Sequence, residues 1–595
     1  MRARLYALFV LVTLLVACAG DATRPHLFST DWLDDQGKSI GEVEQRLSRA
    51  RPVSADISIV VAVTGPQADK LVGLPMSGGP PWSFKHALDA RPVVAEGGVV
   101  VGSGGNEVFA LEALTGKLLW TRPTGGLALL GAGDDGATTA VSLTSGSNST
   151  ILVVGRDGTI KRQIETDKQI GDPAVIAGVL FVPWQNQYVS AIDASTGDEL
   201  GRVTLRDKVT RAQVIGGTLY FGEVAYVRFD DKINMASRGG ANRITIPSRE
   251  LPGTPRLLVP GTEKLPPVAS AHDRDRLFAR PTSSGSGPVA MDSGRFYASY
   301  FRLAFGFDAK RGNLAWVHTH DADLIGGEAI AGGLLVCDER GRVTVLSATD
   351  GRVVGQREFG EPIRSCVVNV DAFKASASAG PTMSLGEQIT LAVQNREATL
   401  ATAQRLLLRE LATLPEESAT KTLIDVASDP RTAPVLVADA RAALATRRNG
   451  VEYMLTSLGR HYDFLKDVLM SPPVGPIADA LAAMKEPRAA PLLATHLLDP
   501  ADTDDDTRRA AAALSIVATK EELSRLYKFF AMYRGTAEGE QQVLAVASAA
   551  EAILRLDPKE GGKAVDAAAK SEMTVPALRP RLDALLTASS GAKTK

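Results

Sequence analysis

A repeat of about forty residues is the feature that most constrains how this chain folds. It recurs between Asp56 and Phe373, and each copy contains an apolar strand, a Gly-Gly or Asp-Gly pair, a second strand and a third strand that ends in a turn. Because a repeat array grows as one body, the 595 residues need not form the several separate domains that their length suggests. The turn glycines of the copies are Gly116, Gly158, Gly197, Gly312 and Gly351.

The repeat predicts a β-meander in each copy. Its glycine permits the positive φ that a tight hairpin requires, and the flanking strands alternate or are apolar throughout. One such sheet cannot bury both of its faces, whereas copies arranged around an axis can. We therefore predict a β-propeller over residues 56–373, with six blades between Arg91 and Glu361.

A seventh blade is predicted to be split between the two ends of this domain. Residues 363–370 form one of its strands, and pairing the ends of the ring leaves no free edge for aggregation. An eighth blade is an open alternative, because residues 247–288 are ambiguous; their Pro, Ser, Gly and charged residues favour a long loop. The N-terminal strands of the split blade are expected at 57–63, 71–74 and 83–88.

Two copies carry a distinctive motif. Residues 110–120 are Ala-Leu-Glu-Ala-Leu-Thr-Gly-Lys-Leu-Leu-Trp, and residues 306–316 are Gly-Phe-Asp-Ala-Lys-Arg-Gly-Asn-Leu-Ala-Trp. The motif resembles the PQQ-type β-propeller repeat, and it is similar to that of the propeller lipoprotein of the outer-membrane barrel-assembly machinery. The resemblance implies a propeller fold and a structural docking role for Trp120 and Trp316. Shorter copies lie at 191–197 and 345–351.

The same resemblance raises the possibility of a quinoprotein dehydrogenase. Those enzymes hold a quinone on a tryptophan floor beside a calcium ion bound by Glu and Asn, with a catalytic Asp, and many have vicinal cysteines over the cofactor. This chain has three cysteines, none adjacent to another. The resemblance covers only the scaffold motif, so we expect no cofactor and no enzymatic activity.

The first residues are predicted to form a lipoprotein signal peptide, residues 1–17. Arg2 and Arg4 precede an apolar run at 5–16 that is too short to span a bilayer as a helix. The run ends in Leu-Val-Ala-Cys, which resembles a bacterial lipobox and implies cleavage before Cys18 and acylation of that cysteine. A plain secretory leader with an incidental cysteine is the alternative.

Lipidation of Cys18 would anchor the chain at the periplasmic face of the cell envelope. Several acyl chains give a stable anchor where one chain is marginal, and residues 18–55 would form the tether. Ala19 rather than Asp follows the cysteine, which under the enterobacterial sorting rule indicates the outer membrane. Two other cysteines remain, Cys337 and Cys366. They could pair in the oxidising periplasm, or pack separately as small hydrophobes.

The second half of the chain is predicted to be helical. A linker at 374–383 is followed by a region rich in Ala and Leu, residues 384–595. Residues 480–517 resemble a HEAT-type repeat, with a Pro-Arg turn and a later Arg-Arg-Ala-Ala run. The resemblance implies paired helices stacked in a solenoid with a concave face. A generic helical bundle is the alternative.

Local motifs predict where these helices begin and end. Ser384 with Glu387, and Thr519 with Glu522, have the spacing of capping boxes. Asp-Pro pairs are expected between helices, because proline fits the first turn of a helix and not its interior. These pairs lie at 429–430, 499–500 and 557–558. The predicted apolar face of one helix contains Leu523, Leu526, Tyr527 and Phe530.

Two clusters contain the residue types of metal ligands. His318 and His320 project from the same side of a predicted strand, near Asp321 and Asp323, so a divalent metal is conceivable. An exposed outer strand that runs into a loop is the favoured interpretation. The acidic run at 502–506 lacks the glycine and distal glutamate of a calcium loop, which favours acids at a helix start. We predict no metal and no catalytic residue.

Composition excludes one class of partner. The chain has 66 Lys and Arg against 68 Asp and Glu, a net charge of -2, whereas nucleic-acid binding requires a basic excess. Propellers and helical repeats both present large rigid surfaces. We therefore predict a lipid-anchored periplasmic scaffold that binds envelope proteins, acting in outer-membrane protein assembly. The alternative is a quinoprotein-like enzyme or small-ligand receptor with a site on the propeller axis.

Overall fold

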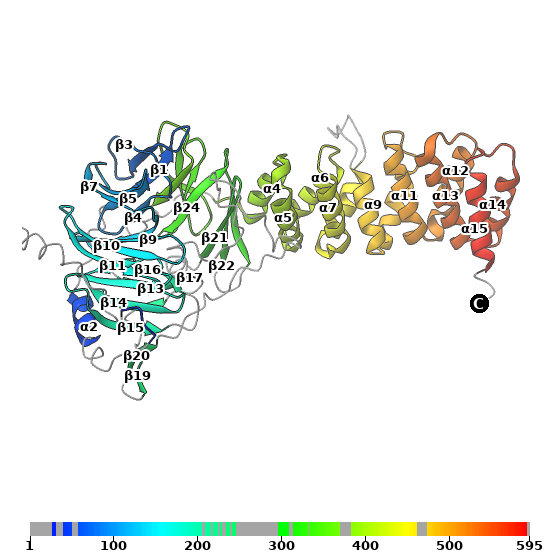
Figure 1. Cartoon of the computed structure of the whole chain (residues 1–595). Helices are drawn as coiled ribbons and strands as arrows, with labels where there is room; N and C mark the ends of the chain where they lie inside the picture. The colour runs from blue at the N-terminus through cyan, green and yellow to red at the C-terminus, as the bar shows by residue number, and fades with distance from the viewer. Residues whose placement is uncertain are drawn as a thin grey trace, which may run out of the picture. The chain divides into compact units, whose positions relative to one another are not determined.

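The computed structural model forms two compact units, with a boundary between Thr382 and Met383 (Figure 1). The predicted signal peptide, Cys18 and the loop at 247–288 lie outside the described residues, as does most of the linker. In the described residues, no helix combines the length and apolar character needed to cross a bilayer. The structure describes residues 27–30, 40–49, 58–204, 209–215, 218–223, 227–228, 234–238, 241–245, 295–308, 313–330, 332–368, 382–460 and 473–591.

Antiparallel meanders build the N-terminal unit, in the sheet succession of a β-propeller. A short hairpin, β19–β20, extends the third sheet through parallel pairing of β20 with β15. The first three sheets contain β4 (Val93–Ala95), β5 (Val99–Gly104), β6 (Glu107–Glu112) and β7 (Leu118–Pro123); β8 (Ala128–Asp134), β9 (Thr138–Thr144), β10 (Ser149–Gly155) and β11 (Ile160–Thr166); and β12 (Ala174–Ile176), β13 (Val179–Trp184), β14 (Tyr188–Asp193), β15 (Glu199–Thr204), β19 (Asn234–Arg238) and β20 (Ala241–Thr245). The next three contain β16 (Val209–Ile215), β17 (Thr218–Glu223) and β18 (Val227–Arg228); β21 (Arg295–Tyr300), β22 (Leu303–Asp308) and β23 (Leu314–Thr319); and β24 (Leu324–Ile330), β25 (Gly333–Asp338), β26 (Arg342–Ser347) and β27 (Val353–Glu358).

A further sheet combines the two ends of the unit. Strand β28 (Ser365–Val368) pairs antiparallel with β1, and the sheet order is β28-β1-β2-β3. The prediction of a split blade is thereby confirmed. Whether further blades exist stays open, because residues 246–294 lie outside the described residues. The other three strands are β1 (Ile59–Thr64), β2 (Lys70–Pro75) and β3 (Trp82–Lys85).

Tryptophans attach neighbouring sheets to one another. The Trp316 indole is buried and donates to the carbonyl of Ala348 in the next sheet, at 2.9 Å. A Cβ on Gly351 would lie 2.5 Å from that indole, and Gly351 has a φ of 70°, so this turn requires glycine twice over. A Cβ on Gly158 would lie 3.0 Å from the Cβ of Trp120, but the Trp120 indole N–H has no hydrogen-bond partner in the described residues. Arg122 Nη2 donates to the Gly158 carbonyl instead. The docking role predicted for Trp316 is confirmed, whereas, within the described part of the chain, Trp120 lies against its glycine turn without the indole hydrogen bond.

The contact that Trp316 makes with the next sheet recurs at two other boundaries between sheets. At one of them an arginine takes the place of the tryptophan. Trp82, which the sequence analysis did not assign, donates to the carbonyl of Ala113 at 2.7 Å and covers Gly116. Between the second and third sheets, Arg162 takes this place and donates to the carbonyl of Ser195, from Nε at 3.0 Å and from Nη2 at 2.7 Å.

Part of the predicted tether, residues 18–55, packs on the third sheet. Helix α2 (Ile40–Arg49) contributes Arg46, whose guanidinium pairs with Asp193 at 2.7 Å. Phe28 is 2% exposed in the core between the second and third sheets. The ordered propeller unit therefore begins before the first predicted strand.

Helices of the C-terminal unit stack in sequence order. Along one row, α5 contacts α7, α7 contacts α9, α9 contacts α11, α11 contacts α13 and α13 contacts α15. Along the other, α4 contacts α6, α6 contacts α8, α8 contacts α10 and α10 contacts α12. The helices are α4 (Leu385–Gln394), α5 (Ala401–Thr413), α6 (Glu417–Ser428), α7 (Pro434–Thr446), α8 (Val451–Leu458), α9 (Val474–Ala483), α10 (Ala490–His496), α11 (Asp504–Val517), α12 (Leu523–Tyr533), α13 (Gly539–Leu556), α14 (Glu560–Lys570) and α15 (Arg579–Gly591).

Side chains from later helices complete the C-terminal ends of earlier ones. The carbonyls of the last turn have no partner within their own helix. Arg447 is buried and donates to three carbonyls, those of Leu411, Ala412 and Glu416. Arg555 does the same for Leu514, Ser515 and Ala518.

The predicted helix starts are found where the motifs place them. Both capping boxes, Ser384 with Glu387 and Thr519 with Glu522, are present. Thr503 caps α11, and three acids occupy its first turn, as predicted for most of the acidic run. The assignment of Asp502 to a helix start was wrong, because this residue precedes the cap and its carboxylate binds His496.

Candidate functional site

The two cysteines left open by the sequence lie together. A disulfide joins Cys337 on β25 to Cys366 on β28, and both residues are buried in one core cluster. The bond therefore connects the sixth sheet to the sheet that closes the ring. Cys18, the predicted lipidation site, lies outside the described residues.

His318 and His320 lie together, as their positions on one predicted strand indicate, but the expectation that this strand is exposed was wrong, because His320 is only 6% exposed. His318 Nε2 and His320 Nδ1 are 3.4 Å apart, and His320 Nε2 lies 3.2 Å from Asp338 Oδ2. His320 thus directs different nitrogens at His318 and at Asp338, so the three groups do not converge on one metal position. Burial, together with the neighbouring His320, lowers the pKa of His318 to about 4. Asp321 instead pairs with Arg342 at 2.9 Å, and Asp323 with Arg302 at 3.3 Å.

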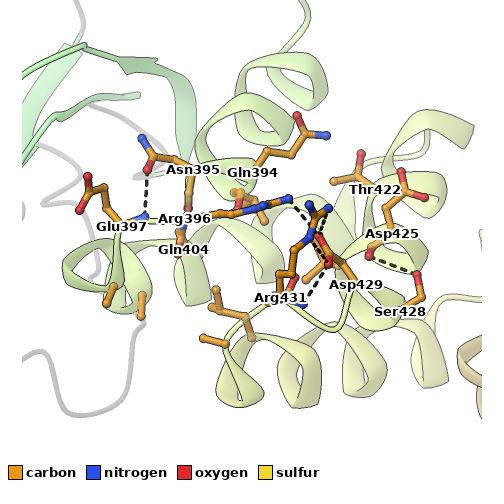
Figure 2. Close-up of a pocket in the computed structure, with 17 residues that line it drawn as sticks. Gln394, Asn395, Arg396, Glu397, Gln404, Thr422, Asp425, Ser428, Asp429 and Arg431 are labelled. Atoms are coloured by element: carbon orange, nitrogen blue, oxygen red, sulfur yellow. Dashed lines mark hydrogen bonds and ion pairs between the residues drawn. The ribbon is translucent and has the colours of Figure 1, made fainter.

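A cavity with a volume of about 850 Å³ lies in the helical unit (Figure 2). Its walls come from the end of α4, the start of α5, helix α6 and the start of α7. Gln404 fixes one wall by donating to the carbonyls of Ala392 and Val393, at 3.1 and 3.3 Å. Ligand pockets in proteins have volumes of this order.

A charged group occupies the centre of this helical pocket. Figure 2 shows Arg396 and Arg431 both directed at Asp429. Arg431 binds the carboxylate through Nε at 3.0 Å and Nη2 at 3.2 Å, and Arg396 pairs with it at 3.3 Å. Hydrogen bonds from Arg431 hold the pKa of Asp429 below its ordinary value. Both arginines remain more than half exposed, at 57% and 67%, so the pairs add little stability.

Polar side chains with donors and acceptors surround this group. Gln394 is exposed, and Asn395 accepts from the backbone N–H of Glu397 at 3.1 Å. Ser428 donates to the carbonyl of Ile424 at 2.8 Å. Amide and hydroxyl groups are thus part of the pocket lining. The sequence analysis found Asp429 only as part of an Asp-Pro turn and missed the site.

A second, smaller cavity lies where end strands of five sheets converge, as at the axis of a propeller. Its volume is about 230 Å³. Burial raises the pKa of Asp172 to about 7 despite the opposing charge of Arg211. Arg211 Nη1 is buried and has no hydrogen-bond partner in the described residues. Gly131 allows the Asp172 carboxylate to approach, since a Cβ there would lie 1.8 Å from it.

Residues 71–132, from β2 into β8, match the family model described as "Outer membrane protein assembly factor BamB". The N-terminal unit contains a PQQ-like β-propeller domain. A search of curated proteins found no match.

Solved structures similar to this chain include BamB from Moraxella catarrhalis, with 16% identity, a TM-score of 0.29, and coverage of 53% of this chain and 88% of that one. A protein of unknown function from Bacteroides caccae has 13% identity and a TM-score of 0.25, over 52% of this chain and 98% of that one. Dihydro-heme d1 dehydrogenase NirN in complex with DHE has 12% identity and a TM-score of 0.28, over 52% of this chain and 64% of that one.

Proposed function

We propose that this chain is a lipid-anchored scaffold of the bacterial envelope that binds other envelope proteins during outer-membrane protein assembly. The observation that carries the proposal is the match of residues 71–132 to the assembly-factor family model. Acylation of Cys18 would hold the protein at the periplasmic face of the outer membrane. In this proposal the propeller has seven blades, the helices form a HEAT-like solenoid, and the chain has no catalytic activity.

The helical pocket is the proposed contact for an extended segment of a partner protein. Amide and hydroxyl groups at its rim suit a peptide backbone, which offers one donor and one acceptor per residue. The described residues give Arg396 no partner except Asp429, so its other guanidinium donors are available to a carbonyl or carboxylate of the partner.

Affinity purification of the full-length protein, tagged at Lys595, from detergent-solubilised envelopes tests the proposal. We expect outer-membrane barrel proteins or their assembly factors to co-purify, and Arg396→Ala to reduce their recovery. Arg488→Ala is the matched control, because Arg488 is also an exposed arginine paired with carboxylates, on a later helix pair. A protein recovered with no envelope partner contradicts the proposal; equal recovery with both variants rejects only the pocket.

The cavity between the propeller end strands supports a second candidate, a receptor for a small ligand. The specific observation is the buried Arg211 Nη1 without a hydrogen-bond partner, next to a carboxyl group whose pKa is about 7. A small carboxylic acid could accept a hydrogen bond from Arg211 and form another with the Asp172 carboxyl group. Native mass spectrometry of the purified chain should then detect a bound small acid that Arg211→Met loses, and absence of any ligand rejects this candidate.

A further inference from the structure

His496 is held by both of its ring nitrogens at the end of α10. Its side chain is fully buried. Nε2 lies 2.8 Å from the carbonyl oxygen of Leu458, and Nδ1 lies 2.8 Å from Asp502 Oδ2. Because a carbonyl can only accept, Nε2 carries a proton and donates it. The other ring nitrogen, Nδ1, points at the Asp502 carboxylate.

The carboxylate of Asp502 is buried beside His496. The side chain is 1% exposed, and Oδ1 is buried with no hydrogen-bond partner in the described residues. A buried carboxylate oxygen without a donor is costly. Asp499 adds a third group, and one ligand atom from each of His496, Asp499 and Asp502 lies within 4.8 Å of the others.

We propose that His496, Asp499 and Asp502 form a binding site for a divalent zinc ion. One imidazole nitrogen and two carboxylates are ligand types that Zn²⁺ accepts, and water can complete its coordination. The Leu458 carbonyl that accepts from Nε2 is the kind of outer partner that orients a metal-bound histidine. The ion would join the end of α10 to the turn before α11, and the Nε2 hydrogen bond of His496 would hold the end of α8 beside it. When no ion is bound, the proton of the His496–Asp502 hydrogen bond occupies the same place.

Metal titration of the untagged full-length chain tests the site. We expect one Co²⁺ to bind with a visible absorption spectrum and Zn²⁺ to displace it. Asp499→Asn should weaken Zn²⁺ binding about tenfold or more, since even outer partners of metal ligands are worth about 10–100-fold. This variant keeps the oxygen that accepts from the Ala501 N–H at 2.9 Å. Asp504→Asn, on the adjacent turn, is the control and should bind like wild type.

Absence of Co²⁺ and Zn²⁺ binding in the wild type overturns the site, as does equal binding by Asp499→Asn. If circular dichroism shows that Asp499→Asn does not fold, X-ray absorption at the zinc edge of the wild type decides. A shell that includes one imidazole and carboxylate oxygens supports the site. A shell of water alone means that His496 serves only as a hydrogen-bonded cap on α8.

Discussion

The two units connect their repeats by different means. In the propeller, one residue at a fixed motif position docks on the glycine turn of the next sheet, as Trp316 does on Gly351, and the ring is closed by β28 and a disulfide. In the helical unit, the side chains of Arg447 and Arg555 donate hydrogen bonds to backbone carbonyls at the ends of earlier helices. These two arginines do not belong to a repeated motif. Stability in the propeller therefore depends on closure and on repeated docking, whereas the helical unit depends on local contacts.

The largest expected effect comes from the docking tryptophan. Trp316→Ala should destabilise the propeller by about 3–5 kcal/mol, because it removes a fully buried aromatic side chain. Scanning calorimetry should show one transition shifted down and the other, from the helical unit, unchanged. If both transitions move together, the two units do not unfold independently and the comparison fails.

Opening the covalent closure should have a slightly smaller effect. Cys337→Ala should lower propeller stability by about 2–4 kcal/mol, since the disulfide restricts the unfolded chain. Reductant should produce the same shift in wild-type protein and no shift in the variant. A shift of the helical transition would contradict this assignment.

Acid should affect the propeller through His318. Its pKa is about 4 in the fold against about 6.5 in the unfolded chain, so the unfolded state binds more protons between these values. Neutral, buried His318 therefore makes its full contribution to the free energy of unfolding above pH 6.5. That contribution is lost as the pH falls towards 4, and the free energy of unfolding decreases by about 2–3 kcal/mol. Denaturant unfolding at pH 7 and pH 4.5 measures it. His318→Asn should remove this part of the pH dependence; an unchanged dependence would contradict the assignment.

The smallest expected effect is a helix cap. Thr519→Ala should destabilise only the helical unit, by about 1 kcal/mol, because it removes the acceptor for the Glu521 N–H. Scanning calorimetry of the thermal unfolding transition of the helical unit measures this loss of stability. Ser384→Ala removes the equivalent cap on α4 and should have a similar effect; a propeller shift in either variant would be unexpected.

Sequence patterns predicted the parts of the fold that rest on local or repeated determinants. The turn glycines, the split blade, Trp316 and the capping boxes each depend on residue types at fixed spacing. The predicted linker boundary also lies close to the observed one at Thr382. These determinants are visible because each copy of the motif needs them for the same physical reason.

Contacts between distant, unrepeated positions could not be predicted. Arg396 and Asp429 approach across 33 residues, and no spacing marks them as a pair. Asp502 resembled the helix-start acids beside it, yet its carboxylate binds His496, six residues earlier. Packing of α2 on the third sheet likewise depends on tertiary contacts that a tether-like composition does not reveal.

Photo-crosslinking in living cells tests the scaffold function most directly. A photoreactive residue replaces Gln394 at the rim of the helical pocket, and a second variant carries it at Lys570, an exposed position on α14 away from the pocket. We predict that Gln394 crosslinks to an outer-membrane protein or an assembly factor and that Lys570 does not. No adduct from Gln394, or the same adducts from both positions, would contradict a partner-binding pocket on this scaffold.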